Sequence, residues 1–116
     1  MKKQVLVVED EKRWHNKWSQ ALEGKDVILI NAFSIKEAEQ EFNANPDIAA
    51  IVMDDCVPGD YPTTIPLVKK FREVFKSPII AVSISKTYRQ WLIQAGCDYE
   101  AKKDELPEKL LEILGM

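Results

Sequence analysis

The segment from Ile48 to Gly59 most constrains how this 116-residue chain can fold. Its sequence, IAAIVMDDCVPG, is an apolar run that ends in two acids and a Pro-Gly turn. The apolar run consists of Ile, Ala and Val with one Met, which is typical of a central parallel strand buried on both faces. Ligands of open α/β sheets bind outside the carboxyl ends of strands, so Asp54 and Asp55 lie where a functional site is expected. The alternative is that both acids begin a solvated turn, where Asp is common.

A second short run, QVLVV from Gln4 to Val8, also ends in adjacent acids, Glu9 and Asp10. Five segments have strand character, and helical patterns separate them: the predicted strands are residues 4–8, 27–30, 48–53, 79–83 and 99–102. This alternation predicts an α/β fold, a three-layer αβα sandwich around a five-stranded parallel sheet with right-handed crossovers. Without a linker or internal repeat, residues 1–116 are expected to form a single domain.

Three predictions concern side chains on the helices. Trp14 and Trp18 are one helical turn apart, and we expect them to pack in the core and not to bind a cofactor. The single histidine, His15, excludes a multi-histidine metal site and is expected at the surface of the same helix. A later helix is predicted from Ile65 to about residue 75, with Val74 among the residues on its buried side.

Composition excludes several classes of protein. The formal net charge is -3, and the 16 Lys and Arg residues form no basic stripe, so a nucleic-acid-binding surface is not expected. The apolar stretch near the N-terminus is too short for a signal peptide or a membrane span, which predicts a cytoplasmic protein. Cys56 and Cys97 are isolated, so we expect two reduced thiols and neither a zinc site nor a disulfide.

Three of the acids are expected to meet if the first and third strands are neighbours: Glu9, Asp10 and Asp54. At a separation of about 4 Å and an effective dielectric constant near 20, each pair of charges costs on the order of 4 kcal/mol. A cation or raised pKa values must therefore compensate for the repulsion. Oxygen ligands with no His or Cys partner select a hard cation, and this donor set fits Mg2+.

A carboxylate beside Mg2+ can attack a phosphorus atom and form an acyl phosphate. The remaining phosphoryl oxygens need donors, and the chain offers Ser83 at the end of the fourth strand and Lys103 after the fifth. Each of these groups has an ordinary alternative. Ser83 could be a turn residue, and Lys103 could belong to a solvated Lys-Lys pair. Glu9 and Asp10 could stand at a helix N-terminus, where acids complement the helix dipole. Their joint position at the carboxyl ends of the strands favours a functional site.

These motifs resemble the receiver (CheY-like) domain of bacterial two-component response regulators over essentially the whole chain. VLVVED is similar to the first strand of the family with its acidic pair, and MDDCVPG to the phosphoacceptor segment, whose modified Asp precedes a Pro by four residues. AVSIS resembles the fourth strand with its hydroxyl switch, and QAGCDYEAKKDELPEKLLEIL the final segment, with its Lys seven residues after Gly. The resemblance implies a flavodoxin-like fold with strand order 2-1-3-4-5.

The resemblance also implies a function. A histidine kinase or histidine phosphotransfer protein would phosphorylate Asp54, with Mg2+ held by Glu9 through water, by Asp10, by Asp54 and by the backbone carbonyl of Cys56. Lys103 would pair with the phosphoryl group, and Ser83 would move to hydrogen-bond it. Such a protein is not a multi-turnover enzyme, because it only accepts and loses its own phosphoryl group. It signals to a downstream target or output domain through altered protein contacts, with a homodimer as one option.

Two departures from the family pattern support an alternative. Glu100 occupies the position of the usual aromatic switch residue, and the loop that contains DYPTT replaces the usual Met-Asp-Gly. The alternative is a pseudo-receiver that acts as a phosphate-independent dimerisation or adaptor module. A third hypothesis, a Mg2+-dependent phosphohydrolase with an aspartyl nucleophile, would resemble a DxD arrangement, which DDC does not match.

Overall fold

The computed structural model describes residues 2–58 and 62–116. Its strands form one parallel sheet in the order β2-β1-β3-β4-β5, which confirms the predicted fold class and strand order. The strands are β1 (Lys3–Val8), β2 (Val27–Ala32), β3 (Ile48–Asp54), β4 (Ile79–Val82) and β5 (Tyr99–Ala101). Part of the predicted DYPTT loop, residues 60 and 61, lies outside the described residues.

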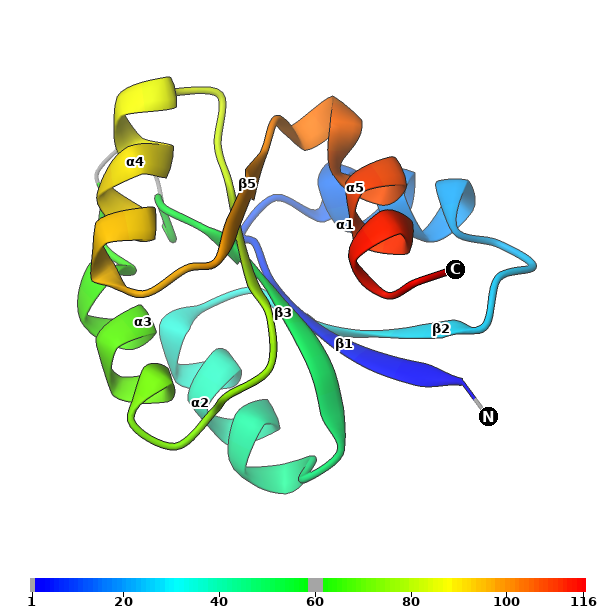
Figure 1. Cartoon of the computed structure of the whole chain (residues 1–116), viewed down its shortest axis with the longest axis horizontal. Coiled ribbons are helices and arrows are strands. Elements are labelled where there is room, and N and C mark those ends of the chain that lie inside the picture. Colours follow the sequence, from blue (N-terminus) through cyan, green and yellow to red (C-terminus); the bar gives the residue numbers. More distant parts are fainter. Residues whose placement is uncertain (1, 59–61) are drawn as a thin grey trace.

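Helices cover both faces of the sheet, as the alternation of elements predicts. They are α1 (Lys12–Ala21), α2 (Ile35–Ala44), α3 (Ile65–Arg72), α4 (Lys86–Ala95) and α5 (Leu106–Ile113), with a short 3-10 turn η1 (Lys103–Glu105) before the last. Helices α1 and α5 lie on one face, and α2, α3 and α4 lie on the other (Figure 1). The sandwich therefore has the three predicted layers.

The central strands are buried on both sides because successive side chains of a strand point to opposite faces. In β1, Val5 and Val7 pack in the core beneath α1 and α5, whereas Leu6 and Val8 pack beneath α2 and α3. The same alternation along β3 explains why its sequence is apolar without interruption. Both central strands are thus held firmly, and the residues that follow them are positioned by the core.

The prediction for the end of α3 was wrong. The helix ends at Arg72, and Val74 is 72% exposed. The guanidinium of Arg72 donates hydrogen bonds to the carbonyls of Phe75 and Ser77, at 2.9 Å each, so the chain curls around this side chain. The curl turns Phe75 back against Phe42 and leaves Val74 pointing outward.

A membrane-spanning helix would need a long apolar segment. In the part of the chain that the structure describes, every helix is too short or too polar to span a bilayer.

Candidate functional site

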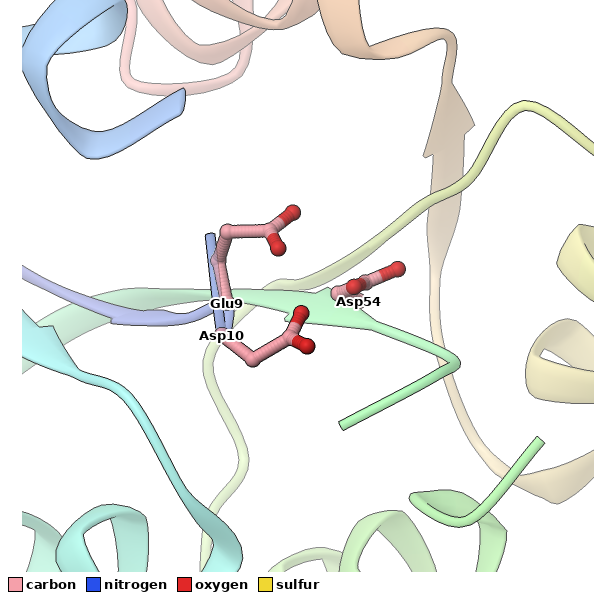
Figure 2. Close-up of side chains that lie close together, drawn as sticks. All are labelled: Glu9, Asp10 and Asp54. Carbon is pink, nitrogen blue, oxygen red and sulfur yellow. The ribbon is translucent and has the colours of Figure 1, made fainter. Parts of the chain in front are cut away.

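Three carboxylates meet at the carboxyl end of the sheet. Val8 is paired with Met53 in the register of β1 and β3, so Glu9 and Asp54 lie at the ends of adjacent strands. Ligand oxygens of Glu9, Asp10 and Asp54 all lie within 4.8 Å of one another, and Figure 2 shows the three side chains gathered at the end of β3. Glu9 and Asp54 are buried and Asp10 is half-buried. The predicted convergence of these acids is confirmed.

A buried lysine lies against two of the acids. Lys103 Nζ is 2.7 Å from Glu9 Oε1 and 3.5 Å from Asp54 Oδ2. The side chain of Lys103 is only 9% exposed, whereas its neighbour Lys102 faces solvent. This contrast rules out the alternative in which both lysines form a solvated pair. Among the described residues, one ammonium group therefore lies against two members of the cluster of three carboxyl groups.

The site carries too little positive charge for its acids. Burial, and then the charge of Glu9, raises the pKa of Asp54 to about 9. Burial also raises the pKa of Glu9, although Lys103 opposes the shift. Burial by itself would lower the pKa of Lys103, but its hydrogen bond to Glu9 and the charge of Asp54 more than offset this, and the pKa is raised. A proton or a second cation must therefore occupy the site at neutral pH.

The donor set fits a hard divalent cation. The three clustered side chains offer only carboxylate oxygens, which are the ligands that Mg2+ and Ca2+ prefer, and neither His nor Cys nitrogen or sulfur ligands are part of the cluster. A cation with two charges would also remove the need for a proton on Asp54. The charge of the site and the chemistry of its ligands thus both indicate a hard divalent cation.

Two of the clustered acids, Asp10 and Asp54, and the predicted phosphoryl donors line one open cavity of about 250 Å³. Its lining residues are Asp10, Glu11, Asp54, Asp55, Cys56, Ser83, Ile84, Ser85, Tyr88 and Lys103. Ser83 directly follows β4, and its Oγ accepts a hydrogen bond from the Ser85 N–H at 3.1 Å. The cavity therefore brings together Asp54, Ser83 and Lys103, with Cys56 at its edge. The ligand role of the Cys56 carbonyl stays a prediction.

Tryptophans of α1 position the lysine. Trp18 is buried and its Nε1 donates a 2.8 Å hydrogen bond to the backbone carbonyl of Lys103. Lys103 Nζ lies 5.6 Å from the centroid of the Trp14 ring, within cation–π range. Trp14 and Trp18 also contact each other, with ring centroids 5.8 Å apart. Core packing of Trp18 is confirmed, but its hydrogen bond to Lys103 has no signal in the sequence.

The prediction for His15 was wrong. The imidazole is 2% exposed and lies 4.2 Å from the ring of Phe33, measured between centroids. Its Nδ1 is 2.7 Å from Asn31 Oδ1, and its Nε2 is 2.6 Å from the backbone oxygen of Glu9. Both partners lie at the ends of strands, and helical periodicity cannot reveal contacts of this kind. His15 thus fixes the backbone at Glu9.

Two threonines before α3 hold the segment that follows Asp54. Thr64 is buried, and its Oγ1 donates a 2.7 Å hydrogen bond to the carbonyl of Asp54. The Thr63 N–H donates to the carbonyl of Asp55 at 2.8 Å, and Thr63 Oγ1 donates to that of Val57 at 2.7 Å. The described end of the DYPTT loop therefore fixes the candidate phosphoacceptor in place.

Glu100 forms an ion pair in place of the expected aromatic residue. Arg89 of α4 is buried, and its Nε donates to Glu100 Oε1 at 2.9 Å. Nη1 of the same guanidinium donates to the carbonyl of Ser83 at 2.7 Å and lies 3.4 Å from that of Ile84. This cluster connects α4 and β5 with the residue that carries the predicted hydroxyl switch.

Comparison with known proteins supports the resemblance to receiver domains. A two-component response regulator from Clostridium difficile is similar at 22% identity with a TM-score of 0.82, covering 98% of this chain and 97% of that one. The receiver domain of a Francisella response regulator is similar at 25% identity with a TM-score of 0.79, covering 97% of each chain. A probable response regulator/GGDEF domain protein matches at 21% identity and a TM-score of 0.82, with 97% of this chain aligned to 49% of that one.

No family model matches the sequence, and no curated protein matches it. The fold of this chain is nevertheless that of receiver domains over nearly its whole length. The predicted resemblance and the flavodoxin-like fold are confirmed.

Proposed function

We propose that this chain is a response-regulator receiver that accepts a phosphoryl group on Asp54 from a histidine kinase or a histidine phosphotransfer protein. The observation that carries the proposal is the cluster of Glu9, Asp10 and Asp54 against the buried Lys103, at the functional edge of a receiver fold. Ser83 lines the same cavity, where its hydroxyl can donate a hydrogen bond to a phosphoryl oxygen. The protein works in the cytoplasm on its own phosphoryl group and is not a multi-turnover enzyme.

The transfer starts with an ionised Asp54. Asp10 and Asp54, Glu9 through water, and the Cys56 carbonyl would hold Mg2+, which neutralises charge on the entering phosphoryl oxygens. A carboxylate oxygen of Asp54 attacks the phosphorus atom of phosphohistidine, and the P–N bond breaks. The imidazole leaves with the bonding electron pair and takes up a proton. The product is an aspartyl phosphate whose oxygens pair with Lys103.

Phosphorylation adds about -1.5 to -2 charges and three acceptor oxygens at this edge of the sheet. The Ser83 hydroxyl turns toward a phosphoryl oxygen and gives up its hydrogen bond from the Ser85 N–H. Because Arg89 holds the carbonyl of Ser83, this movement reaches α4 and Glu100. The signal passes to a downstream protein, an attached output domain or a second copy of the chain, which distinguishes the two states by affinity.

The phosphate-independent alternative receives less support from the site. A module that no longer uses phosphate has no need of buried acids, a buried lysine and a hydroxyl around one cavity, because these groups cost free energy to bury. Glu100, which motivated the alternative, forms an ion pair with Arg89. Arg89 in turn donates a hydrogen bond to the backbone carbonyl of Ser83.

Intact-mass measurement after incubation with Mg2+ and acetyl phosphate tests the proposal. Wild type should gain one phosphoryl group in an acid-stable, base-labile linkage, and the gain should require Mg2+. Asp54→Asn should gain none, whereas Asp47→Asn should behave as wild type, because Asp47 is an exposed residue just before the opposite end of β3. If wild type gains no phosphoryl group, even from a phosphorylated histidine phosphotransfer protein, the phosphate-independent module becomes the better account.

A further inference from the structure

The acid that follows the phosphoacceptor has no role in the function proposed above. Asp55 is 1% exposed and lines the same cavity as Asp54 and Lys103. Its Oδ2 is buried and has no hydrogen-bond partner among the described residues. A buried carboxylate oxygen without a partner is costly, so a structure that retains one needs a reason.

Hydrogen bonds from the loop before α3 hold the backbone of Asp55 in place. Its carbonyl accepts hydrogen bonds from the N–H groups of Thr63 at 2.8 Å and Thr64 at 3.3 Å. Its carboxyl group helps to raise the pKa of both Asp54 and Cys56, through charge and through hydrogen bonding. Asp55 therefore lies close enough to Asp54 to affect its ionisation, and its backbone is fixed by the loop before α3.

The described basic side chains do not compensate for this charge. Lys103 forms ion pairs with Glu9 and Asp54, and no ion pair in residues 2–58 and 62–116 includes Asp55. With Asp55, the site has four carboxyl groups and one ammonium group. The unpartnered Oδ2 is thus an acceptor that points to a ligand able to donate hydrogen bonds and carry positive charge.

The geometry also separates Asp55 from the inner ligands. Oxygens of Glu9, Asp10 and Asp54 are mutually within 4.8 Å, and Asp55 is not a member of that group. We propose that Asp55 is a fourth, outer carboxylate of the cation site, accepting a hydrogen bond from a water molecule bound to the divalent ion. This inference rests on the cation site of the proposed function.

Hydrated Mg2+ suits such an arrangement. The ion gives up its waters reluctantly and is usually bound through a few carboxylates, while several waters remain in place. A carboxylate in the outer position orients one of these waters and adds its charge to the attraction. Removing a partner of this kind typically lowers metal affinity by about 10-fold to 100-fold. Asp55 should therefore tighten Mg2+ binding by about 10-fold.

Calorimetric titration of the metal-free protein with MgCl2 tests the inference directly. Asp55→Asn should weaken Mg2+ binding about 10-fold, as expected for an outer ligand. Asp47→Asn provides the matched control, because it removes the same charge from an exposed residue just before the far end of β3, and its affinity should stay within about twofold of wild type. Asp10→Asn, which removes an inner ligand, should lose more affinity than Asp55→Asn.

A second measurement guards against a folding artefact. In EDTA, Asp55→Asn should melt at or above the temperature of wild type, because it removes a buried charge that forms no ion pair among the described residues. Added Mg2+ should then raise the melting temperature of wild type more than that of the variant, since tighter binding stabilises more. If Asp55→Asn does not fold, Asp55→Ser removes the same charge and takes its place in both measurements.

The outcomes separate this inference from the proposed function. If wild type binds Mg2+ and becomes phosphorylated while Asp55→Asn binds Mg2+ as tightly, the outer-ligand role is overturned and the receiver function stands. If wild type neither binds Mg2+ nor becomes phosphorylated, both are overturned. Weaker binding by Asp55→Asn, with Asp47→Asn unchanged, supports the inference.

Discussion

Two buried cations lie at the carboxyl end of the sheet, and their surroundings differ. The side chains of Lys103 and Arg89 are 9% and 8% exposed. Lys103 contacts Glu9 and Asp54, which are themselves buried, and a third acid adjoins them. Arg89 contacts Glu100, whose side chain is 40% exposed, and otherwise donates to neutral carbonyl groups.

The comparison separates a cluster whose charges are balanced by its own residues from one that needs a further cation. The charge of Arg89 is matched by one partly solvated carboxylate, and its other N–H donors reach backbone acceptors, so no ligand is needed to balance this cluster. Around Lys103 the acids outnumber the cation, and the pKa values of Glu9 and Asp54 are raised. Such an imbalance is typical of a site that is completed by a ligand. Four predictions test the difference, from the largest effect to the smallest.

Lys103→Met should have the largest effect on stability. It leaves buried carboxyl groups without the one basic partner that the described residues give them, and it should lower the free energy of unfolding by about 3 kcal/mol at pH 8 in EDTA. At pH 5 the loss should be smaller, because protonation of Glu9 and Asp54 relieves the repulsion. Urea unfolding at both pH values measures the difference. An equal loss at pH 5 and pH 8 would show that the acids do not depend on Lys103.

Arg89→Gln should have a smaller effect that does not depend on pH. The substitution removes charged hydrogen bonds to Glu100 and to the Ser83 carbonyl, which should cost about 2 kcal/mol of unfolding free energy. The charge of Arg89 is balanced by Glu100 and lies outside the acid cluster. The loss should therefore be the same at pH 5 and pH 8, and with or without Mg2+. The same urea experiment provides the measurement. A loss that Mg2+ reverses would contradict the proposed separation of the two clusters.

Asp54→Asn should stabilise the metal-free protein. The pKa of Asp54 is about 9 in the folded chain against 3.8 for an ordinary Asp, so the folded state binds more protons than the unfolded state between these values. The free energy of unfolding of wild type should therefore fall as pH rises from about 4 to about 9. The variant lacks this contribution, and at pH 8 it should be more stable by about 1 to 2 kcal/mol.

Thermal unfolding of wild type and Asp54→Asn across this pH range, in EDTA, tests whether the stability of wild type falls as pH rises. Mg2+ should raise the stability of wild type and reduce the advantage of the variant. A wild type that becomes more stable as pH rises toward 9 would show that Asp54 is ionised without a cation.

Glu100→Gln should have the smallest effect. Its carboxylate is partly exposed and screened by solvent, so its ion pair with Arg89 should contribute about 0.5 kcal/mol. The loss should shrink further in high salt, in contrast to the Lys103 variant. Chemical denaturation at low and high salt measures this. Glu105→Gln is the control for net charge, because Glu105 is exposed and forms no ion pair among the described residues. A loss as large as that of Arg89→Gln would assign the stability of the cluster to the ion pair itself.

The site also shows which contacts local patterns could predict. Glu9, Asp10 and Asp54 were predicted to meet because each follows an apolar strand, and parallel strands place their carboxyl ends at one edge of the sheet. Ser83 and Lys103 were predicted by the same reasoning, and both line the cavity. Their roles in phosphoryl transfer stay predictions.

Contacts between side chains of distant elements were not predictable in this way. The burial of His15 depends on Asn31 and on the Glu9 backbone, and periodicity along α1 gives no sign of either. The pairing of Arg89 with Glu100 depends on how α4 lies against β5. The outward turn of Val74 follows from the hydrogen bonds of Arg72 beyond the end of α3.

The sequence by itself determined the five-strand alternation, the burial of β1 and β3, and the edge at which the acids gather, because hydrophobic periodicity and strand direction are local properties. Only the tertiary structure decided which polar groups are satisfied and which are left short of a partner. Lys103 is buried against Glu9, while Asp55 Oδ2 is buried without a partner among the described residues. Hydrogen bonds and ion pairs require distances near 3 Å between residues far apart in the chain, and only packing sets those distances.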